Sequence, residues 1–299
     1  MQQPPPWVPQ SIAGKVSLLQ QEPAQLRRAE GPALAYLAAA GRQPGVVFLA
    51  GFMSDMTGAK ATALAQFCAD RGQAFVRFDY RGHGQSQGSF AEACVGDWLA
   101  DALAVIDQLT EGPQILVGSS MGGWLALLVA LARPARVGGL IGLAAAPDFT
   151  EELIWQALSP DERNKLMTEG ALHEPSPYGA QPYCFSRKLI EDGRTHLLLN
   201  RDVIAVDCPV RLLHGMADRD VPFATALRIA ERLASTDVVV SLIKDADHRL
   251  SRDEDLGRLC QSVAELTARI SAAPVRPDAA APEAPRDNRD NAGESRARS

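Results

Sequence analysis

The sequence predicts an α/β domain in which a doubly wound, mostly parallel sheet carries helices on both faces. Short, nearly continuous apolar runs alternate with longer helix-like segments, and such runs suit strands that are buried on both faces of a parallel sheet. The alternation indicates successive strand–helix–strand units. Strands are expected at 46–50, 74–79, 114–118, 139–144, 210–214 and 238–243, helices at 57–71, 97–109, 122–133 and 224–233, and edge strands at 15–20 and 33–38.

The two ends of the chain differ in composition from the middle. Residues 1–12 are rich in Pro and Gln, and residues 273–299 combine Pro, Ala and charged residues with almost no large apolar side chains. A segment of that kind buries too little apolar surface to offset the entropy lost on ordering. We therefore expect one folded domain at 13–272, a Pro-rich segment before it and a disordered tail after it.

One segment, 149–200, interrupts the alternation. It separates two predicted core strands by far more residues than a crossover needs, and long insertions of this kind often close over an active site. We expect a helical lid, with a purely structural cap as the alternative. The candidates for lining an apolar substrate pocket are Phe149, Trp155, Leu158 and Phe185, from a stock that also includes Leu153, Tyr178 and Tyr183.

Composition and charge disfavour several classes of function. A net charge of -6 does not suit nucleic-acid binding, which needs a basic face. No apolar run reaches the roughly 18–20 residues of a membrane span. The first residues show neither a secretory signal nor an Arg-rich transit peptide, so we expect a soluble, cytoplasmic protein without stable membrane insertion. The five cysteines show no C-x-x-C spacing, which disfavours disulfides and a zinc site.

Ser120 is the candidate nucleophile. It is the centre of Gly118-Ser119-Ser120-Met121-Gly122, a G-x-S-x-G match that follows a predicted strand and precedes a predicted helix. A turn of this kind holds the central Ser in strained backbone geometry and lifts its hydroxyl above the sheet. Glycines are expected at both ends, because a side chain there would collide with the neighbouring strand and helix. An ordinary strand–helix turn is the alternative interpretation.

The order of the remaining residues selects the base. A serine hydroxyl becomes a good nucleophile only when a neighbouring base takes its proton, and in this arrangement the order is Ser, acid, His. His83 precedes the nucleophile, His173 and His196 fall in the insertion, and His214 ends a strand, where we expect it to pack at the strand edge. His248 follows the last predicted strand and is the expected base.

The acid should follow the strand at 210–214. Asp218 and Asp220 both lie in the loop there, and Asp218 is preferred because it is closer to the end of the strand. Its expected role is to accept a hydrogen bond from the imidazole N–H and so to select the tautomer of the base. The backbone N–H groups of Met121 and Phe52 are the expected oxyanion donors. No metal and no cofactor is expected.

Long segments around these residues resemble a known family. GPQILVGSSMGGWLAL, CPVRLLHGMADRDVP, FVRFDYRGHGQS and LASTDVVVSLIKDADHR are similar to the mitochondrial palmitoyl-protein thioesterase and acyl-glucuronide esterase branch of the α/β-hydrolases. The resemblance covers roughly residues 45–260. It implies the α/β-hydrolase fold, a triad of Ser120, Asp218 and His248, and hydrolysis of acyl thioesters and acyl esters such as glucuronides. The mitochondrial address is not expected to carry over, because no transit peptide is evident.

The function expected from these observations is that of a serine esterase or thioesterase. Its substrate would be a small molecule or a lipid-acyl compound, with an S-acylated protein as a further candidate. Two alternatives remain open: a carbon–carbon bond hydrolase that uses the same triad, and a non-catalytic ligand-binding module on the same fold. Dehalogenases and epoxide hydrolases of this fold use an Asp nucleophile, so Ser120 disfavours both.

Overall fold

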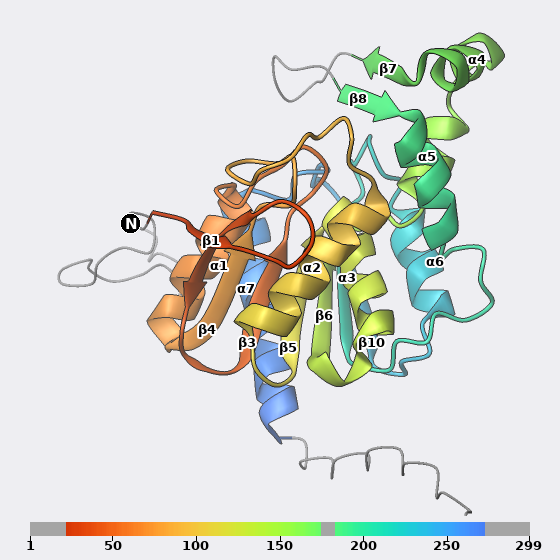
Figure 1. Cartoon of the computed structure of the whole chain (residues 1–299). Helices are drawn as coiled ribbons and strands as arrows, with labels where there is room; N and C mark the ends of the chain where they lie inside the picture. Colours follow the sequence, from red (N-terminus) through yellow and green to blue (C-terminus); the bar gives the residue numbers. More distant parts are fainter. Residues whose placement is uncertain (1–21, 175–182, 273–299) are drawn as a thin grey trace, which may run out of the picture.

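One sheet of eight strands forms the centre of the computed structural model, which describes residues 22–174 and 183–272 (Figure 1). The strand order is β1-β2-β4-β3-β5-β6-β9-β10. Strand β2 is antiparallel to both of its neighbours, and every other neighbouring pair is parallel. The strands are β1 (Ala24–Leu26), β2 (Leu34–Ala39), β3 (Arg42–Leu49), β4 (Gln73–Phe78), β5 (Gln114–Ser119), β6 (Val137–Leu143), β9 (Val210–Gly215) and β10 (Val238–Ile243).

The doubly wound α/β fold is confirmed. All six expected central strands and all four expected helices are present, with bounds within four residues of the expected ones, and the run expected at 33–38 is β2. The run at 15–20, like the Pro-rich segment and the tail, lies outside the described residues. The main helices are α1 (Ala59–Arg71), α2 (Val95–Leu109), α3 (Met121–Ala132), α6 (Ala224–Arg232) and α7 (Asp253–Ala272).

Helix α7 was missed from the sequence. It packs with α1 on one face of the sheet, while α2 and α3 cover the other face (Figure 1). Leu259, Val263 and Leu266 are buried along one side of α7. Their spacing of four and three residues is that of a helix face, so the signal was present in the sequence. A strongly acidic first turn and several Arg residues dilute the apolar pattern around it.

The insertion between β6 and β9 is only partly helical, which corrects the expectation of a helical lid. Ser159 and Glu162 form a capping box that starts α4, and Gly170 ends the helix in the left-handed region at φ 89°. The chain then forms a two-stranded antiparallel sheet. The elements are a π-helical segment (Thr150–Trp155), α4 (Pro160–Glu169), β7 (Ala171–Glu174), β8 (Tyr183–Ser186), α5 (Arg187–Gly193) and a 3-10 turn (Arg194–His196).

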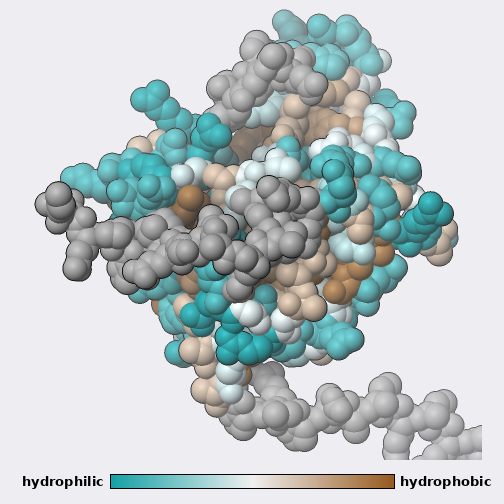
Figure 2. Space-filling view, turned by 90° about the vertical axis from the view of Figure 1, so that its left-hand side faces the viewer, coloured by the Kyte–Doolittle hydropathy of each residue, from teal (hydrophilic) through white to brown (hydrophobic). Residues whose placement is uncertain are grey.

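The insertion lies above the sheet in Figure 1, at the end where the parallel strands terminate. Brown, apolar surface is visible beneath the uppermost part of the molecule in Figure 2. In an open α/β sheet, ligands bind beyond the carboxyl ends of the strands, so this is where a site is expected. Within 22–174 and 183–272, no helix combines the length and the apolar character that a membrane span requires.

Candidate active site

Ser120 lies at the tight turn between β5 and α3. Its backbone angles are φ 54° and ψ -119°, a strained conformation that a residue other than Gly holds only when its surroundings enforce it. A Cβ on Gly118 would lie 2.2 Å from the carbonyl oxygen of Gly122, and a Cβ on Gly122 would lie 2.1 Å from that of Leu49. Both glycines are therefore required for the turn, as the sequence predicted.

A chain of hydrogen bonds joins Ser120 to the two other residues of the expected triad. The Nε2 of His248 lies 3.2 Å from the Oγ of Ser120, and its Nδ1 lies 2.8 Å from Oδ2 of Asp218. A carboxylate can only accept, so Nδ1 carries the hydrogen and Nε2 accepts from the serine hydroxyl. The structure thus brings together three residues that are far apart in the sequence, in the geometry that proton transfer from Ser120 to His248 requires.

The loops that carry the acid and the base are held side by side by backbone contacts. The N–H of Met216 donates to the carbonyl oxygen of Ile243 (2.8 Å), and that of Ala217 donates to Ala246 (3.0 Å). A Cβ on Gly215 would lie 2.1 Å from the carbonyl oxygen of Ala246, so the close approach requires glycine. These bonds place the side chains of the acid and base loops at a defined separation.

Asp218 is surrounded by donors. Its Oδ1 accepts from the backbone N–H groups of Asp220 (2.9 Å) and Val221 (2.9 Å), and the Nε2 of His214 lies 3.2 Å from its Oδ2. Burial raises the pKa of Asp218, but hydrogen bonds from His214 and His248 outweigh that effect and hold the pKa well below its usual range. Asp218 is therefore ionised at neutral pH.

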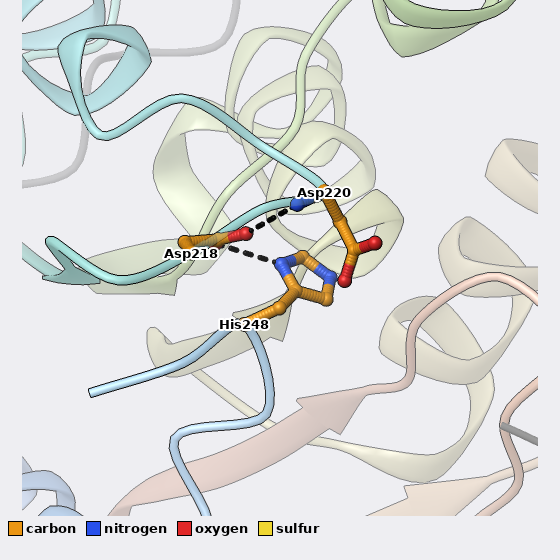
Figure 3. A group of neighbouring side chains, drawn as sticks. All are labelled: Asp218, Asp220 and His248. Carbon is orange, nitrogen blue, oxygen red and sulfur yellow. Dashed lines mark hydrogen bonds and ion pairs between the residues drawn. The ribbon is translucent and has the colours of Figure 1, made fainter. Parts of the chain in front are cut away.

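Asp220, the other acid considered, also lies near the base (Figure 3). Asp218 and Asp220 each offer a carboxylate oxygen and His248 offers a ring nitrogen, and these three possible metal ligands lie within 4.8 Å of one another. A metal ion could bridge that separation. The oxygens of Asp218 are already occupied by four hydrogen-bond donors, one of them Nδ1 of His248. These contacts favour a hydrogen-bonded pair of Asp218 and His248 over a metal site.

The two backbone N–H groups expected as oxyanion donors, those of Phe52 and Met121, belong to segments next to Ser120. Met121 is the first residue of α3, so its N–H has no partner within the helix. Gly51 and Phe52 follow β3, and a Cβ on Gly51 would lie 3.5 Å from the Cβ of Ser120. Within the described residues, the N–H groups of Phe52 and Met121 make no hydrogen bond.

A cavity of about 550 Å³ adjoins Ser120 and His248. Two of the four expected pocket residues, Phe149 and Phe185, line it, and the ring of Phe52 contacts both, with ring centroids 5.5 Å and 6.1 Å apart. The apolar wall includes Phe52, Phe149, Leu153, Ile154, Tyr183 and Phe185. Such a wall suits an acyl group with few polar atoms.

The structure does not place the other two expected pocket residues in the cavity. The ring of Trp155 contacts two guanidinium groups, 5.3 Å from that of Arg163 and 4.5 Å from that of Arg194, and Leu158 is buried in the apolar core. Both side chains hold the insertion together and do not line the site. Composition revealed their apolar character but not the side of the segment on which they lie. Tyr178 lies outside the described residues.

The other side of the cavity is polar and was missed from the sequence. Lys60 lines it, and its Nζ donates to the carbonyl oxygen of Arg249, one residue after the base (2.5 Å). Burial and the charge of Arg249 lower the pKa of Lys60 to about 8. Lys60 follows the expected oxyanion loop in sequence, but only the fold reveals that it reaches the loop of the base.

The chain is similar in sequence and structure to several known proteins. Residues 42–174 match the family described as "Serine aminopeptidase, S33". The human mitochondrial palmitoyl-protein thioesterase ABHD10 is 41% identical over 271 residues, which cover 90% of this chain and 86% of that protein. The rat protein of the same name is 42% identical over 82% of each chain.

Two solved structures agree with this similarity. Mouse alpha/beta hydrolase domain-containing protein 10 superposes with a TM-score of 0.77 at 41% identity, covering 84% of this chain and all of that one. A structure from Agrobacterium vitis S4 superposes with a TM-score of 0.78 at 40% identity, covering 82% and 98%. Both comparisons confirm the fold over the described core.

The comparisons overturn the expected cytoplasmic location. The rat, mouse, bovine, orangutan and human relatives all carry the word mitochondrial in their names. The lack of an evident transit peptide was the reason for the expectation. That pattern is compositional and weak, and it concerns residues that lie outside the described part of the chain.

Proposed function

The chain belongs to the α/β-hydrolase family that contains the ABHD10 palmitoyl-protein thioesterases, and on that basis we propose that it is a serine hydrolase that cleaves acyl thioesters and acyl esters. The observation that carries the proposal is the strained Ser120, hydrogen-bonded to His248, which is hydrogen-bonded to Asp218. We further propose that the catalytic domain is 13–272 and that 149–200 is its lid.

The proposed reaction proceeds in two halves. The Oγ of Ser120 attacks the acyl carbonyl carbon while its proton passes to Nε2 of His248. The carbonyl oxygen becomes an oxyanion that accepts from the N–H groups of Phe52 and Met121. The carbon–sulfur or carbon–oxygen bond then breaks, and the leaving group takes the proton from His248. A water molecule, deprotonated by the same imidazole, then attacks the acyl carbon. The bond to Oγ breaks, the carboxylic acid product leaves, and Ser120 regains its proton from His248.

The walls of the cavity support an apolar acyl group. Phe149, Leu153 and Phe185 lie on the side of the insertion, and Phe52 lies on the side of the sheet. Each methylene buried there contributes about 0.8 kcal/mol. The names of the relatives state palmitoyl-protein thioesterase activity for those proteins, so an S-acylated protein is one proposed substrate, and small acyl esters and thioesters are others.

The test is covalent labelling with a fluorophosphonate probe, together with turnover of p-nitrophenyl esters and acyl-CoA thioesters. The parent protein should be labelled at one residue and should hydrolyse both substrate classes. Ser120→Ala should abolish labelling and lower turnover by several orders of magnitude, because the acyl-enzyme cannot form.

Ser119→Ala is the matched control. Ser119 is the neighbouring serine at the end of β5, and its side chain is not part of the hydrogen-bonded chain. This variant should keep both labelling and turnover. Retained labelling in Ser120→Ala would overturn the proposal, and a parent protein that is neither labelled nor able to turn over any acyl substrate would favour the ligand-binding module.

A further inference from the structure

His214 touches the same carboxylate oxygen as the base. It is the fifth residue of β9, its side chain is 1% exposed, and its Nε2 lies 3.2 Å from Oδ2 of Asp218. The same nitrogen lies 3.0 Å from the carbonyl oxygen of Val221. From its place at a strand end, this histidine was expected only to pack at the strand edge.

Both neighbours of this nitrogen are acceptors. A carboxylate oxygen and a carbonyl oxygen carry no hydrogen, so Nε2 of His214 must carry one and must share it between Asp218 and Val221. The tautomer is thereby assigned by the network. His214 is a donor to Asp218 in both its neutral and its protonated forms.

With this donor, every acceptor position on Asp218 is filled. Oδ1 accepts from two backbone N–H groups, and Oδ2 accepts from His214 and His248. A carboxylate has about four lone-pair positions. Its plane therefore cannot rotate without breaking a bond to a buried donor, and a buried donor without a partner is costly.

We propose that His214 is a positioning residue for the acid, which orients Oδ2 of Asp218 toward His248 and draws part of its negative charge away from the base. This role rests on the proposed function of the triad. Without the donor, the carboxylate would be less well oriented, and the charge that faces His248 would be less neutralised. Turnover should then fall, and the base should hold its proton to a higher pH.

Other charged groups lie around the same pair. One carboxylate oxygen of Asp220 lies within 4.8 Å of a carboxylate oxygen of Asp218 and a ring nitrogen of His248, and Asp247 and Arg249 flank the base in sequence. Lys60 faces the carbonyl oxygen of Arg249. Strand β10, which pairs with β9 beside His214, presents Leu242 at the matching position and carries no charged residue. The substitutions below leave all of these groups in place.

The experiment compares three substitutions at this position. His214→Phe puts another aromatic ring in place of the imidazole and removes the N–H donor. It should lower kcat/KM by about 10- to 100-fold, the effect of losing one hydrogen bond to a charged group. The acid limb of its kcat/KM profile should move by about half a pH unit to higher pH. His214→Gln places an amide nitrogen near the position of Nε2 and should recover most of kcat/KM and the parent profile. The side chain in His214→Asn is one methylene shorter than in His214→Gln, so its amide does not reach Asp218, and this variant should not recover kcat/KM or the parent profile.

Rates are expressed per active site, counted by fluorophosphonate labelling, so that loss of folded protein does not count as loss of activity. A His214→Phe variant with the parent pH profile, or Gln and Asn variants that behave alike, would overturn the positioning role. If His214→Phe does not fold, the contrast between Gln and Asn decides the question. Failure of the triad itself would appear separately, as labelling that survives in Ser120→Ala.

Discussion

Asp218 differs from Asp220 in burial, because its carboxylate is enclosed among hydrogen-bond donors whereas Asp220 is exposed. The side chain of Asp218 is fully buried and accepts from two backbone N–H groups and two imidazoles. Asp220 supplies one of those donors through its backbone. The order of residues in the sequence distinguishes the two carboxylates less clearly, because a loop sequence does not reveal which side chain is buried.

The first prediction compares these two acids. Asp218→Asn should lower turnover by about three to four orders of magnitude, because an amide N–H directed at the imidazole favours the wrong tautomer. Asp220→Asn should have a much smaller effect. Matched kcat/KM measurements on folded variants check this, with folding established by circular dichroism. The reverse ranking would assign the acid to Asp220.

The buried side chain of His83 is expected to make the stability of the protein depend on pH. It lies among Tyr80, Phe90 and Trp98, with ring centroids between 5.0 and 5.6 Å away, and burial lowers its pKa to about 4. The unfolded chain takes up this proton near pH 6.5. Protons therefore favour the unfolded state between these values, and the contribution to stability is lost as the pH falls from 6.5 toward 4.

The second prediction follows from this sign. His83→Phe should become more stable relative to the parent as the pH falls from 6.5 to 4, by up to about 1.4 kcal/mol per pH unit. Urea unfolding at pH 7, 6, 5 and 4 measures it. The carbonyl oxygen of Arg81, which contacts His83, keeps its bond from Trp98 in the variant. His173→Gln, at an exposed histidine of β7, should show no such trend. Parallel curves for His83→Phe and the parent would contradict the prediction.

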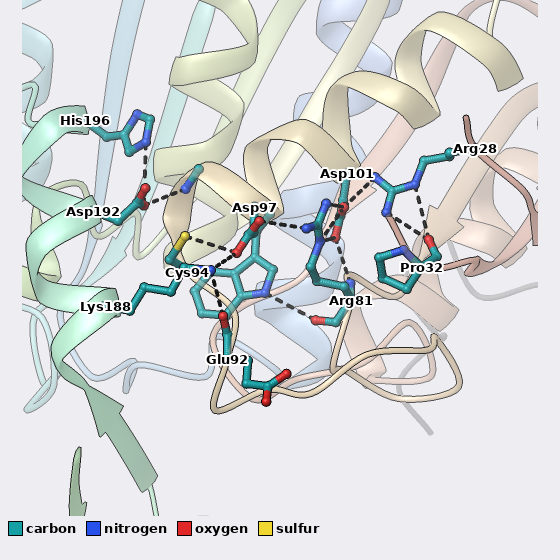
Figure 4. Close-up of polar contacts among 12 residues, drawn as sticks. Arg28, Pro32, Arg81, Glu92, Cys94, Asp97, Asp101, Lys188, Asp192 and His196 are labelled. Carbon is teal, nitrogen blue, oxygen red and sulfur yellow. Dashed lines mark hydrogen bonds and ion pairs between the residues drawn. The ribbon is translucent and has the colours of Figure 1, made fainter. Parts of the chain in front are cut away.

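At the scale of elements, the insertion is tied to the body through the start of α2 (Figure 4). The residue before α2, Cys94, makes no capping hydrogen bond. Instead, Oδ2 of Asp192 on α5 accepts from the N–H of Gly96 (2.8 Å), and Lys188 forms an ion pair with Asp97 (2.7 Å). An anion at a helix N-terminus is favourable, so a residue 96 positions away in sequence caps this helix.

The third prediction concerns this cap. Asp192→Ala should lower the free energy of unfolding by about 1 kcal/mol, as the loss of a helix cap does, and should raise the rate of proteolysis within 149–200. Glu191→Ala is the control. Glu191 is the neighbouring acid on α5, half exposed and paired with Arg187 of the same helix, and such pairs contribute little. Equal effects of the two substitutions would show that the cap does not hold the insertion.

The elements that local patterns specify could be predicted, and those that depend on distant contacts could not. Strands β5, β6 and β9 are buried along nearly their whole length, and their continuous apolar runs are unambiguous. The insertion lacks such a pattern. Its two short strands pair with each other, and its apolar residues divide between the cavity and the core. For the same reason Trp155 and Leu158 were expected in the pocket, and Lys60 was not.

The whole molecule divides the two tasks of a hydrolase between two parts. The sheet and its loops hold Ser120, Asp218 and His248 by short backbone contacts, and the insertion supplies most of the large apolar side chains of the cavity wall. Changes in the wall should therefore alter which acyl group reacts, and changes in the packing of the insertion should alter stability. Two leucines of the same segment allow this separation to be tested.

The last prediction sets Leu153, which lines the cavity, against Leu158, which is 8% exposed in the core and does not line it. In the parent, kcat/KM should rise about fourfold per acyl methylene until the cavity is full, since each methylene contributes about 0.8 kcal/mol. Leu153→Ala should flatten this rise and leave acetate esters almost unaffected. Leu158→Ala should cost about 2–5 kcal/mol of stability and should lower the rates for all esters alike. A C2-to-C12 series of p-nitrophenyl esters, measured beside thermal unfolding, distinguishes the two. If Leu153→Ala lowers every rate in proportion to its lost stability, the insertion acts only as structure and the acyl group is selected elsewhere.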